Sequence, residues 1–418
     1  MGEKRPVPAL VRGARCSVVR GGTFALGAAR SVSHTISSAQ SRLLISIETR
    51  SCLTGPRYAH AIQAIELPFP AIWLRDNCPC ARCRDPQSGQ KLFQISEIPP
   101  GLMIDRVEKA GDTVTVSFGP DPHVSTFSLR WLSAQRPGPQ GDGRTEQDKR
   151  LWKANDLVGA LPVKRWSAYC DEGAERARVL AWVVSLGFAI LQEVPKQDGT
   201  VLEVVKSFGY VRETNYGELF EVRVELSPSN LAFTGLAIAP HTDNPYRDPV
   251  PTLQLLHCLS NAADGGASGL VDGFGAAATL RKEDPAAFET LTTTLVPFAW
   301  QDARARLSAE RPLIEIDPLG RIRAVRFNNR SMQALRLARE DLVSFYDAYR
   351  AFAEVISRPG HELTFRLEPG DCLIFDNTRV LHSRTAFDSC VTGSRHLQGC
   401  YADMDGLMST LAVLTNTP

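Results

Sequence analysis

The sequence predicts a mainly β protein with packed helices, of the β-sandwich or jelly-roll type. Short apolar runs recur along its C-terminal two thirds, and turn residues separate most of them. Neither a Walker loop nor a G-x-G-x-x-G motif is present, which argues against a parallel nucleotide-binding sheet. A chain of 418 residues is long enough for one large core and a small second domain.

The N-terminal part is expected to be a small β domain. Residues 71–78 (AIWLRDNC) are expected to form a strand that runs into a loop. Residues 113–118 (TVTVSF) alternate in the strand period, and residues 123–132 (HVSTFSLRWL) are expected to return as the second strand of a hairpin. Residues 134–149 are polar, rich in Gly and Pro, and without period, so they predict a linker. We therefore expect a leader over 1–58, an N-terminal domain over 59–133, a linker over 134–150 and the main domain over 151–418.

The main domain is expected to contain a helix over 173–187 that ends at a glycine, followed by a buried strand over 187–195. Further strands are predicted at 253–259, 269–273, 311–317, 322–329, 372–377 and 396–403. Further helices are predicted at 274–282, 285–293, 338–356 and 404–413.

Charge and composition limit the partners. The 47 basic and 46 acidic residues give a net charge of +1, which argues against nucleic acid as the main partner. No run of 18 apolar residues exists, so no membrane span is expected. Residues 1–44 are rich in Arg and Ser and poor in acids, as in a mitochondrial presequence, although a disordered leader or a misplaced start codon are alternatives. We expect a soluble intracellular protein, in the mitochondrial matrix if the leader is a presequence and in the cytoplasm otherwise.

Residues 78–83 (CPCARC) hold three of the 10 cysteines of the chain. The other cysteines are scattered, which suits a reducing compartment and disfavours a disulfide framework. A disulfide, a redox pair and a metal site all remain open from these residues alone.

A second candidate site is indicated by four residues that are spread along the chain and do not form a dense cluster. His241 stands two residues before Asp243, and on a strand both side chains would point to one face. His382 follows an apolar strand far downstream, and Arg395 comes after it. Two histidines and a carboxylate can hold Fe(II) with open positions, and an arginine fork can hold the distal carboxylate of 2-oxoglutarate. His257 lies in the apolar strand LQLLHCL, where a satisfied core histidine is expected.

A series of motifs covers nearly the whole chain from residue 71 to the end. They are WLRDNCPCARC (73–83), RETNYG (212–217), HTDNPY (241–246), LQLLHCL (253–259), LVDGF (270–274), RFNN (326–329), GDCLIFDN (370–377), LHSR (381–384) and RHLQGCYADMD (395–405). In these motifs the chain resembles the γ-butyrobetaine dioxygenase family of Fe(II)/2-oxoglutarate-dependent oxygenases. That family also includes trimethyllysine and trimethylaminoethylphosphonate dioxygenases.

The resemblance implies a double-stranded β-helix (jelly roll) catalytic domain and a small N-terminal zinc-binding β domain. It implies Fe(II) and 2-oxoglutarate, a structural Zn(II), ascorbate as reductant, O2 as co-substrate and a homodimer. It also implies no catalytic residue beyond the iron ligands. The implied positions are His241, Asp243 and His382 for iron, Cys78, Cys80, Cys83 and His123 for zinc, and Arg395 for 2-oxoglutarate.

The resemblance further implies an aromatic cage for a trimethylammonium group, because a quaternary nitrogen offers no N–H and binds best to ring faces. The implied substrate-binding residues are Tyr216, Phe220, Phe233 and Tyr401 for the cage, and Asn230 with Asn328 or Asn329 for the anionic end. Phe220 stands where animal members carry tryptophan, and Asn244 replaces a tyrosine. Core packing is the alternative role for Phe220 and Phe233.

The expected reaction is hydroxylation of γ-butyrobetaine to L-carnitine, a step of carnitine biosynthesis. The alternative substrate is 2-(trimethylamino)ethylphosphonate, and trimethyllysine is a third candidate. Two other classes fit less well. A zinc-scaffolded binding module with a vestigial metal site predicts that a ligand or Arg395 is missing, and none is. A zinc hydrolase would need a nearby general base, and no H-E-x-x-H motif exists.

Overall fold

A computed structural model describes residues 69–136, 149–223, 234–387 and 395–416. The described residues fall into two compact units, one before and one after the division between positions 140 and 141. Each unit is described by itself below. No helix among the described residues is long and apolar enough to cross a membrane.

The smaller unit is a three-stranded antiparallel sheet with short helices. Its strands β1 (Met103–Ala110), β2 (Thr113–Gly119) and β3 (Val124–Ser128) pair in the order β1-β2-β3. Alternate residues of β2, Val114, Val116 and Phe118, are buried with Phe127 of β3. The predicted β2–β3 hairpin is therefore confirmed, whereas β1 was not among the predicted strands. The remaining elements are α1 (Ala71–Asp76), the 3-10 turn η1 (Ile95–Glu97) and α2 (Leu129–Ala134).

Two predictions in this unit are wrong. Residues 71–76 form helix α1, where a strand was predicted, and the helix lets Phe69 stack on Trp73 with ring centroids 4.2 Å apart. The end of the predicted strand 123–132 is helix α2, because the Ser128 hydroxyl accepts from the Trp131 N–H at 3.4 Å and caps a new helix.

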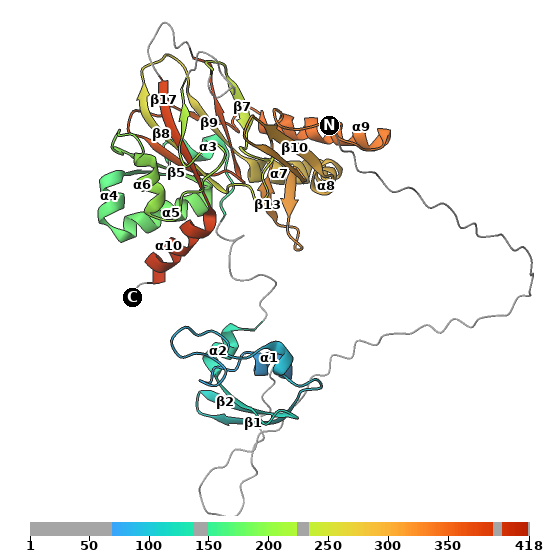
Figure 1. The fold of residues 1–418 in the computed structure, drawn as a ribbon. Coiled ribbons are helices and arrows are strands. Elements are labelled where there is room, and N and C mark those ends of the chain that lie inside the picture. Colours follow the sequence, from blue (N-terminus) through green and yellow to red (C-terminus); the bar gives the residue numbers. More distant parts are fainter. Residues whose placement is uncertain (1–68, 137–148, 224–233, 388–394, 417–418) are drawn as a thin grey trace, which may run out of the picture. The chain divides into compact units, whose positions relative to one another are not determined.

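Two sheets face each other in the larger unit (Figure 1). One sheet has the order β14-β9-β16-β7 and the other the order β4-β5-β15-β8-β17-β6. From β6 to β9 and from β14 to β17, the chain crosses to the opposite sheet with each successive strand, which is the connectivity of a jelly roll. The strands are β4 (Val163–Arg165), β5 (Phe188–Gln192), β6 (Phe220–Val222), β7 (Ile238–His241), β8 (Leu253–Asn261), β9 (Ser268–Asp272), β14 (Leu363–Phe365), β15 (Cys372–Asp376), β16 (Val380–Arg384) and β17 (Arg395–Ala402).

The core between the sheets is apolar and draws on both of them. Leu270 and Val380 of the four-stranded sheet pack in one cluster with Phe188, Phe375 and Leu397 of the six-stranded sheet. Each of these residues is at most 1% exposed, so the two sheets share one close-packed core.

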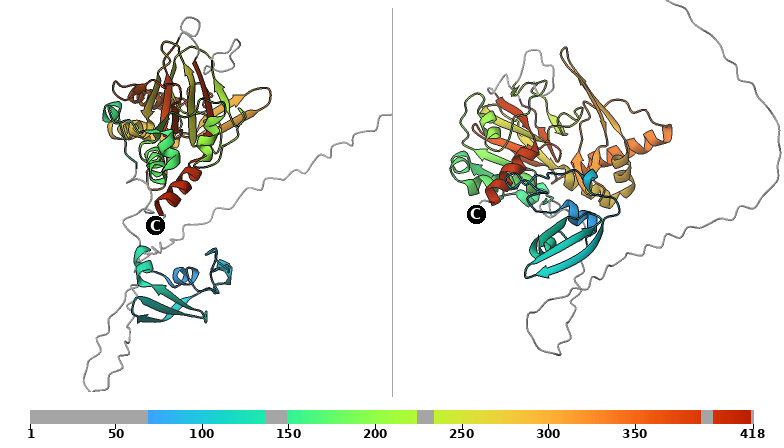
Figure 2. Two further views of the ribbon diagram at one scale, coloured as in Figure 1. Left: turned by 90° about the vertical axis from the view of Figure 1, so that its left-hand side faces the viewer. Right: turned by 60° about the horizontal axis from the view of Figure 1, so that its bottom comes forward.

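Helices cover the outer faces of both sheets (Figure 2). The six-stranded sheet is covered by α5 (Gly173–Leu186), α6 (Thr200–Lys206) and α10 (Met404–Asn416), with α4 (Trp166–Asp171) beside them. The four-stranded sheet packs against α7 (Gly273–Glu283), α8 (Pro285–Thr293) and α9 (Arg339–Ile356). Two β-hairpins pack with these three helices. They are formed by β10 (Val296–Gln301) with β11 (Arg306–Arg311) and by β12 (Ile314–Ile316) with β13 (Ile322–Val325). A short helix, α3 (Ala154–Leu157), lies near the start of the unit.

Local signals account for the helices that the sequence predicted. Gly187 ends α5 with a φ of 87°, a conformation that glycine adopts without steric cost. Asp272 and Asp284 cap the starts of α7 and α8 through side-chain oxygens that accept from backbone N–H groups. The helices predicted at 173–187, 274–282, 285–293, 338–356 and 404–413 are all present within a few residues.

Candidate active site

The predicted iron ligands come together where β7 and β16 pair. His241 at the end of β7 lies directly opposite His382 in the antiparallel register, with ring centroids 4.1 Å apart. Asp243 follows β7, and its carboxylate lies 3.4 Å from His241 Nε2 and 3.8 Å from His382 Nε2. One possible ligand atom from each of the three residues thus lies within 4.8 Å of the other two. This donor set, two imidazoles and a carboxylate, suits Fe(II).

The protonation states of these groups also suit a metal. The His241 Nδ1 atom lies 2.9 Å from the carbonyl oxygen of Ala239, to which it can donate, and this leaves Nε2 free to face Asp243. Burial lowers the pKa of His382 to about 3, so its imidazole is neutral. Burial alone would raise the pKa of Asp243, but the contact with His241 and the positive charge of Arg330 hold that pKa well below its usual range.

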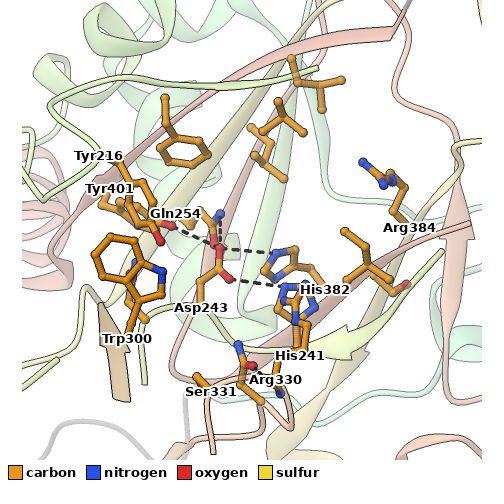
Figure 3. Close-up of a pocket in the computed structure, with 18 of the residues that line it drawn as sticks. Tyr216, His241, Asp243, Gln254, Trp300, Arg330, Ser331, His382, Arg384 and Tyr401 are labelled. Carbon is orange, nitrogen blue, oxygen red and sulfur yellow. Dashed lines mark hydrogen bonds and ion pairs between the residues drawn. The ribbon is translucent and has the colours of Figure 1, made fainter. Parts of the chain in front are cut away.

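Two further side chains orient the Asp243 carboxylate. Gln254 of β8 donates to Oδ2 at 2.9 Å, and the Tyr401 hydroxyl of β17 donates to the same oxygen at 3.2 Å (Figure 3). The second oxygen, Oδ1, is the one nearer His241. Gln254 and Tyr401, both from the six-stranded sheet, therefore fix the side-chain rotamer of Asp243, which follows a strand of the four-stranded sheet.

Asn377 holds the backbone of the same loop. Its Oδ1 accepts from the Asp243 N–H at 2.8 Å, and its Nδ2 donates to the carbonyls of Asp243 and Pro251 at 2.9 and 3.0 Å. The side chain is only 1% exposed. Neither Asn377 nor Gln254 was predicted as a site residue, although each is a polar residue in or just after an apolar strand, which is the signal that marks them.

A cavity of about 330 Å³ opens beside the three ligands. Arg330, Arg384 and Arg395 line it, and Asp243 is the sole acidic residue among its described lining residues. Arg395 begins β17 and is 5% exposed, and its Nε has no hydrogen-bond partner among the described residues. A buried guanidinium with a free N–H fits the carboxylate that 2-oxoglutarate would place there.

Aromatic rings form the opposite side of the cavity (Figure 3). Trp300 and Tyr216 have centroids 5.6 Å apart, Tyr216 and Phe220 6.3 Å, and Phe220 and Tyr401 5.1 Å. Tyr246 also lines the cavity, with its hydroxyl 3.0 Å from that of Tyr216. Three of these rings were predicted, whereas no local motif marks Trp300, which the β10–β11 hairpin brings to the site.

The two predicted anion-binding asparagines have different outcomes. Asn328 lines the cavity, but its Nδ2 donates to the Thr242 carbonyl at 2.9 Å and its Oδ1 accepts from the Arg330 N–H at 3.2 Å. Its amide thus ties two loops of the site together, and a contact with substrate stays a prediction. Asn230 and Phe233 lie outside the described residues.

Two polar residues near this core are buried without a hydrogen-bond partner among the described side chains and backbone. Asn244 follows Asp243 with a φ of 56° and is 2% exposed, and neither polar atom of its amide is paired in the described part of the chain. His257 is fully buried on β8, and both its ring nitrogens likewise lack a partner within the described ranges. The prediction that His257 belongs to the core is right, and the expectation that its ring nitrogens are satisfied stays a prediction.

The cysteine cluster lies in the smaller unit. Cys78, Cys80, Cys83 and His123 offer ligand atoms within 4.8 Å of one another, with His123 Nε2 3.1 to 3.7 Å from the three sulfurs. Burial lowers the pKa of His123, which favours the neutral imidazole that a metal requires. Three cysteine sulfurs and an imidazole are compatible with a zinc site of the closed, structural type.

Comparisons with known proteins agree in both units. Residues 152–401 match the model of the taurine catabolism dioxygenase TauD, TfdA family, and residues 63–133 match a γ-butyrobetaine hydroxylase-like N-terminal domain. The chain is 36% identical to a γ-butyrobetaine dioxygenase of Pseudomonas sp. (strain AK-1), over 83% of this chain and 90% of that protein. It is 32% identical to a trimethyllysine dioxygenase of Meyerozyma guilliermondii, over 83% and 90% of the two chains. It is 30% identical to the Homo sapiens γ-butyrobetaine dioxygenase, over 85% and 95%.

Proposed function

The chain belongs to the taurine catabolism dioxygenase TauD, TfdA family and is a 2-oxoglutarate-dependent dioxygenase, and we propose that it hydroxylates γ-butyrobetaine to L-carnitine. The observation that carries this choice of substrate class is the row of aromatic rings beside the predicted iron ligands. Ring faces are the natural partner of a quaternary ammonium group. The relatives named above point to the same class of substrate.

In this proposal His241, Asp243 and His382 hold Fe(II), and Arg395 holds the distal carboxylate of 2-oxoglutarate. Iron, 2-oxoglutarate and O2 together supply the oxidation of a C–H bond, with CO2 and succinate released. The protein binds the substrate against the rings and keeps Asp243 in place through Gln254 and Tyr401. Its contribution to the rate is therefore position and the exclusion of water.

2-(Trimethylamino)ethylphosphonate is the second candidate substrate. Arg395 is assigned to 2-oxoglutarate, but Arg330 and Arg384 also line the cavity, so positive charge is available to the anionic end of a substrate. A phosphonate would gain more from this positive charge than a carboxylate, since it carries more negative charge. Trimethyllysine fits this end less well, because its ammonium group would meet the same arginines.

The test compares the three trimethylammonium compounds as substrates of the purified protein with Fe(II), 2-oxoglutarate, ascorbate and O2. We expect the highest kcat/KM for γ-butyrobetaine, measured by succinate release and by mass spectrometry of the hydroxylated product. Omission of 2-oxoglutarate and the His241→Ala variant serve as controls. A higher kcat/KM for the phosphonate or for trimethyllysine overturns the choice of substrate.

The smaller unit is proposed to bind a structural Zn(II) through Cys78, Cys80, Cys83 and His123, and not to take part in the chemistry. We also propose the domain limits 59–133 and 151–418 on either side of the linker 134–150. Metal analysis of protein purified without added zinc tests the first point, since the proposal requires one equivalent of zinc that survives removal of iron. Limited proteolysis within 134–150 tests the second.

Three further points extend the proposal. A homodimer is expected and is tested by light scattering at several concentrations. Ascorbate is expected to sustain turnover, which a comparison with and without it measures. A mitochondrial matrix location rests on the composition of residues 1–44, and the mass of the mature N-terminus in cells would reveal whether a leader is removed.

A further inference from the structure

We propose that Trp300 is the main cation-binding wall of the substrate cavity and sets its selectivity for a quaternary ammonium group. This inference rests on the proposed function and adds a residue far in sequence from the other rings of the cavity. Among the described residues that line the cavity, Trp300 supplies the single indole. Tryptophan is the strongest cation–π partner of the aromatic residues.

The geometry places the indole within the row of rings. Its centroid lies 5.6 Å from that of Tyr216, at an interplanar angle of 58°. Tyr246 stacks on the indole at 6.0 Å and 22°, and Tyr246 is itself only 6% exposed. A buried ring thus supports one side of the indole, while the indole also lines the cavity next to Asp243 and Tyr401 (Figure 3).

The charges of the cavity make ring faces important. A quaternary ammonium group needs negative potential, and Asp243 is the sole acid among the described lining residues. The Asp243 carboxylate already accepts from Gln254 and Tyr401 and faces both predicted histidine ligands. The ring faces therefore remain the main source of negative potential for the cation.

The backbone around Trp300 is fixed on both edges of its strand. On one edge Trp300 pairs with Leu307 of β11. On the other edge the Ala299 N–H donates to the Ser331 carbonyl at 2.9 Å, and the Gln333 N–H donates to the Pro297 carbonyl at 2.8 Å. The indole is thus positioned before the substrate arrives, which lowers the entropy lost on binding.

Packing alone is the competing role for Trp300, since it also touches the apolar cluster that contains Tyr246. An isostere of γ-butyrobetaine with carbon in place of the quaternary nitrogen distinguishes cation binding from packing. It keeps the shape and apolar area of the ligand but removes the positive charge. Binding of γ-butyrobetaine and of 5,5-dimethylhexanoate is measured by calorimetry on the full-length protein with Fe(II) and 2-oxoglutarate, without O2. The variants are Trp300→Phe and Trp300→Leu, with melting temperatures recorded to confirm folding.

Trp166→Phe is the matched control, because Trp166 packs on Tyr169 with centroids 5.4 Å apart and does not line the cavity. We expect the preference for the charged ligand over its isostere to fall on the order of tenfold in Trp300→Leu, less in Trp300→Phe, and not at all in the control. An equal loss of both ligands, or no loss of either, overturns the inference. Wild-type protein that prefers the charged ligand but does not hydroxylate it overturns the proposed function and leaves the inference standing. Wild-type protein that shows no such preference overturns the inference.

Discussion

Replacement of Asn377 by alanine is predicted to damage both the fold and the metal site. The substitution removes three hydrogen bonds to the backbone of the loop that carries Asp243 and the nearby Pro251. Because the site is 1% exposed, one N–H and two carbonyls would be left without partners. At about 1 to 1.5 kcal/mol for each hydrogen bond, the expected loss of unfolding free energy is about 3 to 5 kcal/mol.

The loss of this support should also lower the affinity of the site for Fe(II). Residues that orient a ligand typically contribute about 10- to 100-fold to metal affinity, and Asn377 fixes the backbone on both sides of the Asp243 side chain. Urea unfolding without metal gives the stability, and titration with Fe(II) under anaerobic conditions gives the affinity. Asn329→Ala is the control, since Asn329 is exposed and, within the described residues, its side chain accepts a single hydrogen bond, from the Tyr349 hydroxyl at 3.4 Å. Unchanged iron affinity in a folded Asn377→Ala protein would refute the reasoning.

Three other substitutions follow from the structure. Gly399→Ala should raise the KM for substrate several-fold with a smaller change in kcat, because the new methyl group would overlap the Phe220 ring and displace it from the row of rings. An unaltered KM speaks against this arrangement. Burial lowers the pKa of His257 in the folded state, so stability should fall as pH drops below about 6.5, by up to about 1.4 kcal/mol per pH unit. In His257→Gln that acid slope should become shallower, and equal slopes in urea unfolding at several pH values would contradict the assignment. Cys80→Ser should abolish zinc binding and lower hydrogen-exchange protection across 103–128, and full protection without zinc is the opposing result.

Local sequence signals explain the elements that could be predicted. The helix over 173–187 has an apolar period and a terminal glycine, and α8 begins with an aspartate cap followed by proline. Residues 71–76 were predicted wrongly because a segment of six residues with mixed polarity fits either a short strand or a short helix. A local pattern does not show that Leu74 packs with Val107 and Phe127 in the core of the smaller unit, because that contact depends on distant strands.

At the site too, some residues could be predicted from the sequence, whereas others depend on tertiary structure. His241, Asp243, His382 and Arg395 could be proposed as site residues from their order along the chain, since each residue type carries its own chemistry. The register that sets His241 opposite His382 is a tertiary property of the sheet, and no local pattern encodes it. Trp300 has no signal in its own segment, because its place in the cavity depends on a hairpin that packs beside residues 331–333.

The most direct test of the central claim is the coupling of succinate to product. In one reaction, succinate and hydroxylated γ-butyrobetaine are measured together as a function of γ-butyrobetaine concentration. The account predicts equal amounts of the two, both dependent on γ-butyrobetaine and both absent in His241→Ala. Succinate release that is independent of γ-butyrobetaine, or that is accompanied by no hydroxylated product, would contradict it.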